Sequence, residues 1–91
     1  MEHVIVERVY AEPVDVVALA AALKAGHPCL DTYRVRHLRT YVSLDGKRLI
    51  CEYEAPDAES VRAVSQRLRT PYERIWTATV LITNRPSEPG E

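Results

Sequence analysis

The sequence predicts an α+β fold, a ferredoxin-like βαββαβ sandwich in which two helices cover one face of a four-stranded antiparallel sheet. The first observation is the order of its patterns, which follow one another as strand, helix, strand, strand, helix, strand. The second is the stretch 36–56, where two alternating segments flank Asp45-Gly46, a strong hairpin signal because both turn positions need positive φ. Two helices leave the other sheet face uncovered, so we expect either water against it or a second copy that completes a dimeric α+β barrel.

The first half of the chain contains one strand and one capped helix. Residues 3–10 alternate as a half-buried strand does. Asp15 can then cap a helix, and Gly26 can end it. The inward stripe of this helix is predicted to consist of Val16, Val17, Leu19, Ala20 and Leu23. The segment 27–32 fits either a loop or a short helical turn that begins at Pro28.

The second half contains the hairpin, a second helix and a last strand. The hairpin strands are predicted at residues 33–43 and 47–54. Asp57 can cap the next helix, and Thr70-Pro71 ends it because the residue before a proline disfavours the helical region. The inner face of this helix is predicted to be Val61, Val64 and Leu68. The last strand is predicted at residues 74–83, and its helix-facing side chains are those of Trp76, Ala78, Val80 and Ile82.

Composition points to a single domain that binds neither nucleic acid nor a membrane. The chain has 91 residues and a formal net charge of −1, which is not the basic footprint of a nucleic-acid binder. No apolar run approaches the roughly 18–20 residues of a membrane span, and the N-terminus shows no secretion signal. We therefore expect a domain at 1–84, a polar disordered tail at 85–91, and a cytoplasmic location in which Cys29 and Cys51 stay reduced.

The hairpin register divides its side chains between the two faces of the sheet. The face assigned to the helix side carries Leu38, Thr40, Val42, Leu49, Cys51 and Tyr53. The uncovered face carries three predicted cross-strand pairs, which are His37 with Glu54, Arg39 with Glu52, and Tyr41 with Ile50. A solvated sheet surface also shows opposite charges across from one another, and each such pair contributes only about 0.2–1 kcal/mol.

The uncovered face is also a candidate site for acid–base chemistry. A carboxylate orients a neighbouring histidine for proton transfer, so His37 and Glu54 would be catalytic. Tyr41 would donate a hydrogen bond to a developing oxyanion, and Arg39 would hold an anionic substrate. The substrate-binding surface would be completed by Glu52, Ile50 and Glu7.

Metal ligands are sparse in this sequence, and their spacing predicts no metal site and no other cofactor. His27-Pro28-Cys29 could supply two ligands, but no second pair follows at metal-site spacing. On the predicted register Cys51 faces the helices, as a small buried hydrophobe does, and His37 faces away from it. If the protein nevertheless binds nickel, the ligands to expect are His37, His27 and Cys29.

Several short motifs occur together over about residues 4–82. They are Thr40-Tyr41-Val42-Ser43, Asp45, Cys51, Tyr53, Ala55-Pro56, Glu7-Arg8 and Arg74-Ile75. In order and spacing they resemble a family of small domains of unknown function that includes a nickel-binding protein. The resemblance implies a ferredoxin-like protomer that dimerises through its sheet, with nickel binding in at least one member. The nickel-binding pattern has a histidine where this sequence has Arg39, and since a guanidinium cannot coordinate a metal, that place becomes an anion site.

Three functions fit these observations. The leading hypothesis is a small cofactor-independent enzyme of the cyclase, isomerase or dehydratase type, which acts in biosynthesis on an organic small molecule held in a cavity of a homodimer. The second is a nickel-binding or metal-responsive protein, as the resemblance implies. The third is a dimeric ligand-binding module without catalysis.

Overall fold

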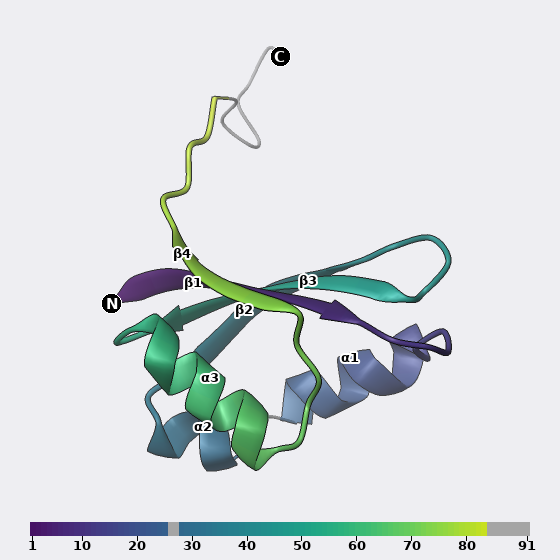
Figure 1. The fold of residues 1–91 in the computed structure, drawn as a ribbon, viewed down its shortest axis with the longest axis horizontal. Helices are drawn as coiled ribbons and strands as arrows, with labels where there is room; N and C mark the ends of the chain where they lie inside the picture. Colours follow the sequence, from purple (N-terminus) through teal and green to yellow (C-terminus); the bar gives the residue numbers. More distant parts are fainter. Residues whose placement is uncertain (26–27, 84–91) are drawn as a thin grey trace.

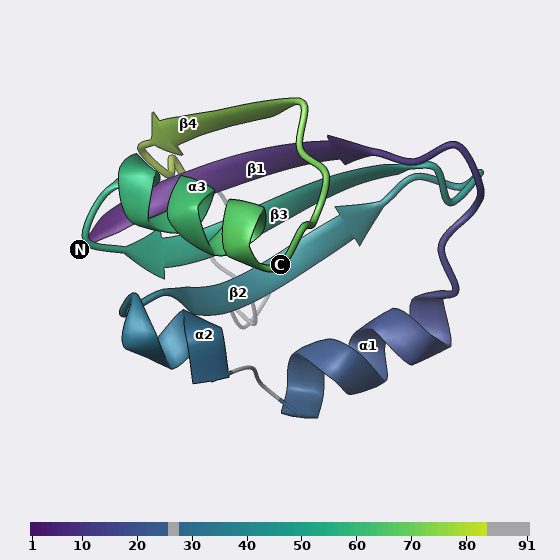
Figure 2. The same ribbon diagram turned by 60° about the horizontal axis from the view of Figure 1, so that its bottom comes forward.

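A four-stranded antiparallel sheet is the frame of the structure, a computed structural model that describes residues 1–25 and 28–83. Its strands are β1 (Glu2–Val9), β2 (Arg36–Val42), β3 (Arg48–Ala55) and β4 (Arg74–Ala78), in the order β2-β3-β1-β4. Its helices are α1 (Val16–Ala25), α2 (Pro28–Thr32) and α3 (Ala58–Arg67). Figures 1 and 2 show the helices on one side of the sheet, which confirms the predicted α+β ferredoxin-like fold.

The core lies between the sheet and α3. Val4 faces Tyr53 across β1 and β3, and Val6 faces Cys51 in the same way. These side chains are buried together with Val35, Leu49, Ala55, Val61 and Val64. Cys51 is only 4% exposed and has a free thiol, so its prediction as a core residue is confirmed.

The hairpin turn forms at the predicted position, but of the two turn residues only Gly46 has positive φ, because the turn runs from Ser43 to Gly46 with the Gly46 amide donating to the Ser43 carbonyl. The Asp45 carboxylate accepts hydrogen bonds from the Ser43 hydroxyl at 2.6 Å and from the Lys47 amide at 3.0 Å. Gly46 has φ of 74°, and a Cβ at this position would approach the Cβ of Pro13 to 3.1 Å. Glycine is therefore required both by the backbone conformation and by the close packing of the neighbouring loop.

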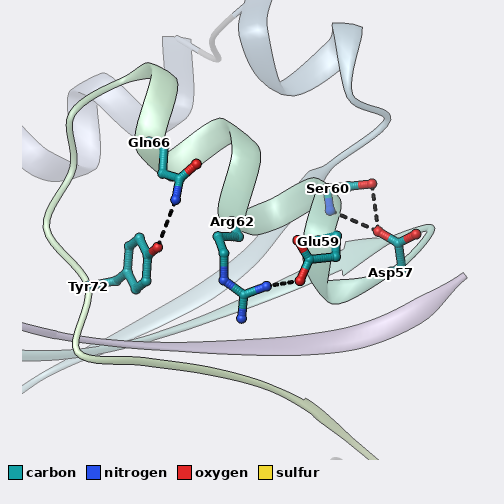
Figure 3. Close-up of polar contacts among 6 residues, drawn as sticks. All are labelled: Asp57, Glu59, Ser60, Arg62, Gln66 and Tyr72. Atoms are coloured by element: carbon teal, nitrogen blue, oxygen red, sulfur yellow. Dashed lines mark hydrogen bonds and ion pairs between the residues drawn. The ribbon is translucent and has the colours of Figure 1, made fainter.

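The helix α3 is held by a cap at its start and by polar contacts along its outer side (Figure 3). The Asp57 carboxylate accepts from the amide and the hydroxyl of Ser60, so the predicted cap is confirmed. Arg62 pairs with Glu59, and the Gln66 amide donates to the Tyr72 hydroxyl at 3.2 Å. The predicted inner face is confirmed, with Val61 and Val64 buried and Leu68 packed against the core.

The side chains of helix α1 are less buried than predicted. Asp15 caps it by accepting from the Val17 and Ala18 amides, as expected. None of its residues is buried, however, and Val16 and Val17 are 53% and 79% exposed. The helix is apolar almost all round, so the sequence does not single out one inward face. Leu19 is the stripe residue that packs against the core.

The strand β4 is shorter than predicted and faces the other way. It ends at Ala78, which pairs with His3 of β1. The partly buried residue that packs against the core is Ile75, which faces Val6. The prediction that Trp76, Ala78, Val80 and Ile82 face the helices is therefore wrong, because it was one residue out of register with the sheet.

The region before β2 is also different from its prediction. The short helix α2 begins at Pro28, which was one of the two alternatives for this segment. Residues 33–35 end α2 instead of extending β2, since the Arg34 amide donates to Asp31 and the Val35 amide donates to Leu30. Arg34 has φ of 60°, a left-handed conformation typical of helix ends. The predicted tail 85–91 lies outside the described residues.

Candidate functional site

The open face is the side of the sheet that carries no helix. The register of the strands assigns to it the side chains of His3, Ile5, Glu7, Arg39, Tyr41, Ile50, Glu52, Glu54, Arg74 and Trp76. Of the residues predicted to form a site, Arg39, Tyr41, Ile50, Glu52, Glu54 and Glu7 are on this face. His37 is not among them.

A β-bulge in β2 moves His37 away from Glu54. The ladder between β2 and β3 pairs Tyr41 with Ile50 and Arg39 with Glu52 as predicted, but it then shifts between Arg39 and His37. A bulge places one extra residue in a strand, so the alternation of side chains changes beyond it. Glu54 consequently faces Arg36, with Arg36 Nη2 3.0 Å from Glu54 Oε1. The predicted catalytic pair of His37 and Glu54 is therefore wrong.

His37 lies instead against the aromatic ring of Tyr53. The two ring centroids are 5.5 Å apart in an edge-to-face arrangement, and His37 Nε2 is 2.7 Å from the Thr40 hydroxyl oxygen. Tyr53 belongs to the core on the helix side. Burial lowers the pKa of His37 below its ordinary value of 6.5. This imidazole is thus a partner of the core and does not face a carboxylate of the open face.

His3 provides the histidine of the open face. Its Nε2 atom is 3.6 Å from Oε1 of Glu52, and both side chains are largely shielded, with 19% and 12% exposed. This nitrogen is buried and has no hydrogen-bond partner among the residues that the structure describes. Oε1 of Glu52 also lies 2.9 Å from Nε of Arg39, whose side chain is 62% exposed. His3, Glu52 and Arg39 therefore form one cluster that draws on β1, β3 and β2.

A second polar group lies on the β4 side of the same face. The Trp76 indole N–H donates to Oε2 of Glu7 at 2.8 Å, and Nη1 of Arg74 is 4.0 Å from that oxygen. Trp76 also stands opposite Ile5, which is 7% exposed although it is on the uncovered side. Trp76 itself remains 44% exposed, so the prediction of a tryptophan inside the core is wrong.

The sequence contained a signal for His3 that its interpretation did not use. His3, Ile5 and Glu7 occupy alternate positions of one strand, so they share a face. Glu7 had been assigned to the candidate site, and the same alternation brings His3 beside it. Arg8 lies on the opposite face and was not assigned a function; it is buried and is described below.

The metal ligands expected from the sequence do not form a described site. Within residues 1–25 and 28–83, no group of three or more histidine, cysteine, aspartate or glutamate side chains is placed to hold an ion. His37 is on the helix side, and the side chains of His27 and Cys29 lie outside the described ones. None of the described helices is long and apolar enough to cross a membrane.

Comparison with known proteins identifies the family. A family model described as "Nickel responsive protein SCO4226-like" matches residues 4–77. The chain belongs to this family. The crystal structure of SCO4226 from Streptomyces coelicolor A3(2) is similar to this SCO4226-like chain with a TM-score of 0.74, at 18% sequence identity, covering 88% of this chain and 99% of that one. A likeness at this identity establishes the fold. The search of curated proteins gave no match.

Proposed function

We propose that this chain is a nickel-responsive protein that binds Ni²⁺ on the open face and pairs with a second copy through that face. The observation that carries the proposal is the buried Nε2 atom of His3, which has no hydrogen-bond partner and points toward a carboxylate oxygen of Glu52 at 3.6 Å. An orphaned imidazole nitrogen is unfavourable unless something binds it. The family match supports nickel as that ligand.

The two side chains fit the chemistry of nickel. Imidazole nitrogen and carboxylate oxygen are both ligands that Ni²⁺ accepts. Arg39 competes for the same carboxylate, because its Nε lies 2.9 Å from Glu52 Oε1. Its side chain is 62% exposed, so the guanidinium can turn into water when a cation takes its place.

A second copy of the chain would supply the further metal ligands that one protomer lacks on this face. His3 and Glu52 are only two donors, whereas a two-fold axis would place the same pair from each copy against one ion. Exposed apolar side chains support this use of the face, since Tyr41 and Trp76 are 53% and 44% exposed on it. The segment after β4 also exposes Val80, Leu81 and Ile82, by 53%, 86% and 67%. Exposed apolar side chains are typical of an interaction surface.

The proton-transfer pair that the cyclase or isomerase hypothesis requires is absent from the described residues of the open face. The proton transfer rested on His37 beside Glu54, and these two residues face opposite sides of the sheet. Arg39, Tyr41 and Ile50 do share the open face as predicted, but as parts of a binding surface.

Calorimetric titration of the tag-free, chelator-treated protein with NiCl₂ tests the proposal. We expect saturable binding of one ion for every two chains, and a weakening of about tenfold or more in His3→Ala and in Glu52→Gln. Arg39→Ala should strengthen binding, because it removes the competing cation from Glu52. His37→Ala is the matched control, since this histidine is on the other side of the sheet and should leave the affinity unchanged.

Sedimentation velocity over a range of protein concentrations tests the pairing of two copies. Trp76→Arg places a charge on the proposed contact surface and should shift the protein toward the monomer. Absence of saturable nickel binding would contradict the proposal. So would an unchanged affinity in His3→Ala together with a loss in His37→Ala, His27→Ala or Cys29→Ser, which would favour the ligands predicted from the sequence.

A further inference from the structure

A cavity of about 230 Å³ lies on the helix side of the sheet, opposite the open face. It is enclosed by the sheet, α1, α2 and α3, whose arrangement Figure 2 shows. Its apolar walls include Leu19, Leu23, Leu30, Val61 and Leu68. Side chains with a hydroxyl or guanidinium group also line it, namely Arg8, Tyr10, Thr40, Tyr53, Ser65 and Thr70. Arg8 contacts Tyr53 and Ser65, so these three form one polar wall of a cavity that is otherwise mainly apolar.

Arg8 is the charged group of that wall, and it is only 5% exposed. Its guanidinium donates to the Pro71 carbonyl at 2.8 Å and, at 3.3 Å each, to the hydroxyls of Tyr53 and Ser65. All three acceptors are neutral, because burial raises the pKa of the Tyr53 hydroxyl above its ordinary value of 10.0. No carboxylate of the described residues lies within 4.0 Å of this guanidinium.

A buried cation without a counter-ion is costly, and proteins ordinarily pair such a charge. The hydroxyls around Arg8 solvate the guanidinium without neutralising it. An anion in the cavity would neutralise it, while the apolar walls would accept the remainder of the same molecule. The location of the charge at one end of an apolar space thus selects for an amphipathic monoanion.

We propose that this helix-side cavity binds a small apolar monocarboxylate, with its carboxylate on Arg8 and its hydrocarbon part between α1 and α3. An engineered apolar cavity of about 150 Å³ holds benzene, so this volume corresponds to roughly nine non-hydrogen atoms. Medium-chain alkyl and single-ring aryl carboxylates have this size. Nη2 of Arg8 donates to the hydroxyls of Tyr53 and Ser65 through long bonds of 3.3 Å, which a carboxylate would replace with stronger charge-assisted hydrogen bonds.

Access to the cavity is provided by α1. Leu19, Ala22 and Leu23 of this helix line the cavity, yet no residue of α1 is buried. A ligand can therefore enter beside α1 without displacing a core side chain. The apolar character of α1 on nearly all sides suits an outer wall that a hydrocarbon chain packs against.

Titration with octanoate, with 1-octanol as the uncharged control of similar length, tests the inference. Binding is followed by calorimetry and by amide chemical shifts of α1 and α3. We expect saturable binding of one octanoate per chain, about tenfold or more tighter than that of 1-octanol. Arg8→Met should remove this preference while leaving the weaker binding of 1-octanol.

Two tryptophan substitutions on α1 make the test independent of Arg8. Ala22 lines the cavity, and Ala20 is on the same exposed helix without lining it. Ala22→Trp should abolish octanoate binding, whereas Ala20→Trp should retain it. Equal affinities for octanoate and 1-octanol, or unchanged binding in Ala22→Trp, would overturn the inference. Neither result bears on nickel, because the proposed nickel ligands are on the other face of the sheet.

Discussion

Replacing Arg8 by methionine should leave the free energy of unfolding almost unchanged, although Arg8 is buried and hydrogen-bonded. The substitution removes the 2.8 Å bond to the Pro71 carbonyl, a charged hydrogen bond of about 1.5–3 kcal/mol. It also removes two bonds of 3.3 Å to Tyr53 and Ser65, which are long for N–H···O contacts and together contribute about 1–2 kcal/mol.

The loss of these hydrogen bonds is opposed by a gain in stability, because the variant no longer has to desolvate a guanidinium on folding. Burying a charged group costs several kcal/mol, and no described carboxylate lies close enough to offset this cost. Methionine keeps the apolar contacts of the arginine stem and carries no charge. The two terms are of similar size, so we expect a change within about 1 kcal/mol of zero.

Urea unfolding followed by far-ultraviolet circular dichroism measures this difference. Leu49→Ala is the comparison, since Leu49 is 2% exposed in the same core and its truncation should cost about 2–5 kcal/mol. If Arg8→Met destabilised the protein as much as Leu49→Ala, the guanidinium would be a structural element of the core. Its charge would then be balanced within the folded chain, without a ligand in the cavity.

Three further predictions concern the cap residues, His37 and Trp76. Asp57→Ala should lower the urea midpoint because α3 contributes to the core, whereas Asp15→Ala should leave it unchanged because no residue of α1 is buried. The pKa of His37 is lowered in the folded state, so the unfolded chain binds a proton first as the pH decreases. The stability contributed by neutral His37 should be full above pH 6.5 and should fall as the pH decreases toward the folded-state pKa. The urea midpoints at pH 7.5 and pH 5.5 should therefore differ less in His37→Gln than in the unchanged protein. Acrylamide should quench the fluorescence of Trp76 in dilute protein, and the quenching should decrease at higher protein concentration if a second copy covers the indole. Glu7→Gln should weaken the hydrogen bond of the Trp76 indole and shift its emission.

The architecture could be predicted because its signals are local. Asp-Gly specifies a tight turn through backbone conformation alone, and Asp57 caps a helix through contacts three residues away. The order of the elements then leaves few ways to build a sheet. Burial of α1 was not predictable in the same way, because its residues are apolar on nearly every side and only tertiary packing selects which of them face inward.

The face of β4 depended on information from outside the strand. Trp76, Ala78, Val80 and Ile82 looked like an inward set because they are apolar and alternate. Pairing with β1 decides otherwise, since Val6 is fully buried and stands opposite Ile75. The tryptophan was thereby moved from the predicted core to the open face, where it is available to a second copy.

The bulge in β2 had the largest consequence for the candidate site. Nothing in Arg36-His37-Leu38-Arg39 marks the position of an extra residue, because the sequence there contains no glycine. Because of the one extra residue, the His37 side chain lies on the core side and Glu54 pairs with Arg36. Glu52 pairs with Arg39 as predicted, and it also lies near His3 of β1. The hairpin pattern of β2 and β3 contains no information about this third strand. The site was therefore predictable as a face with carboxylates and an arginine, whereas the identity of its histidine depended on a single backbone irregularity. Because of that irregularity, the open face carries a cluster of His3, Glu52 and Arg39 from three strands in place of an acid–base pair within one hairpin.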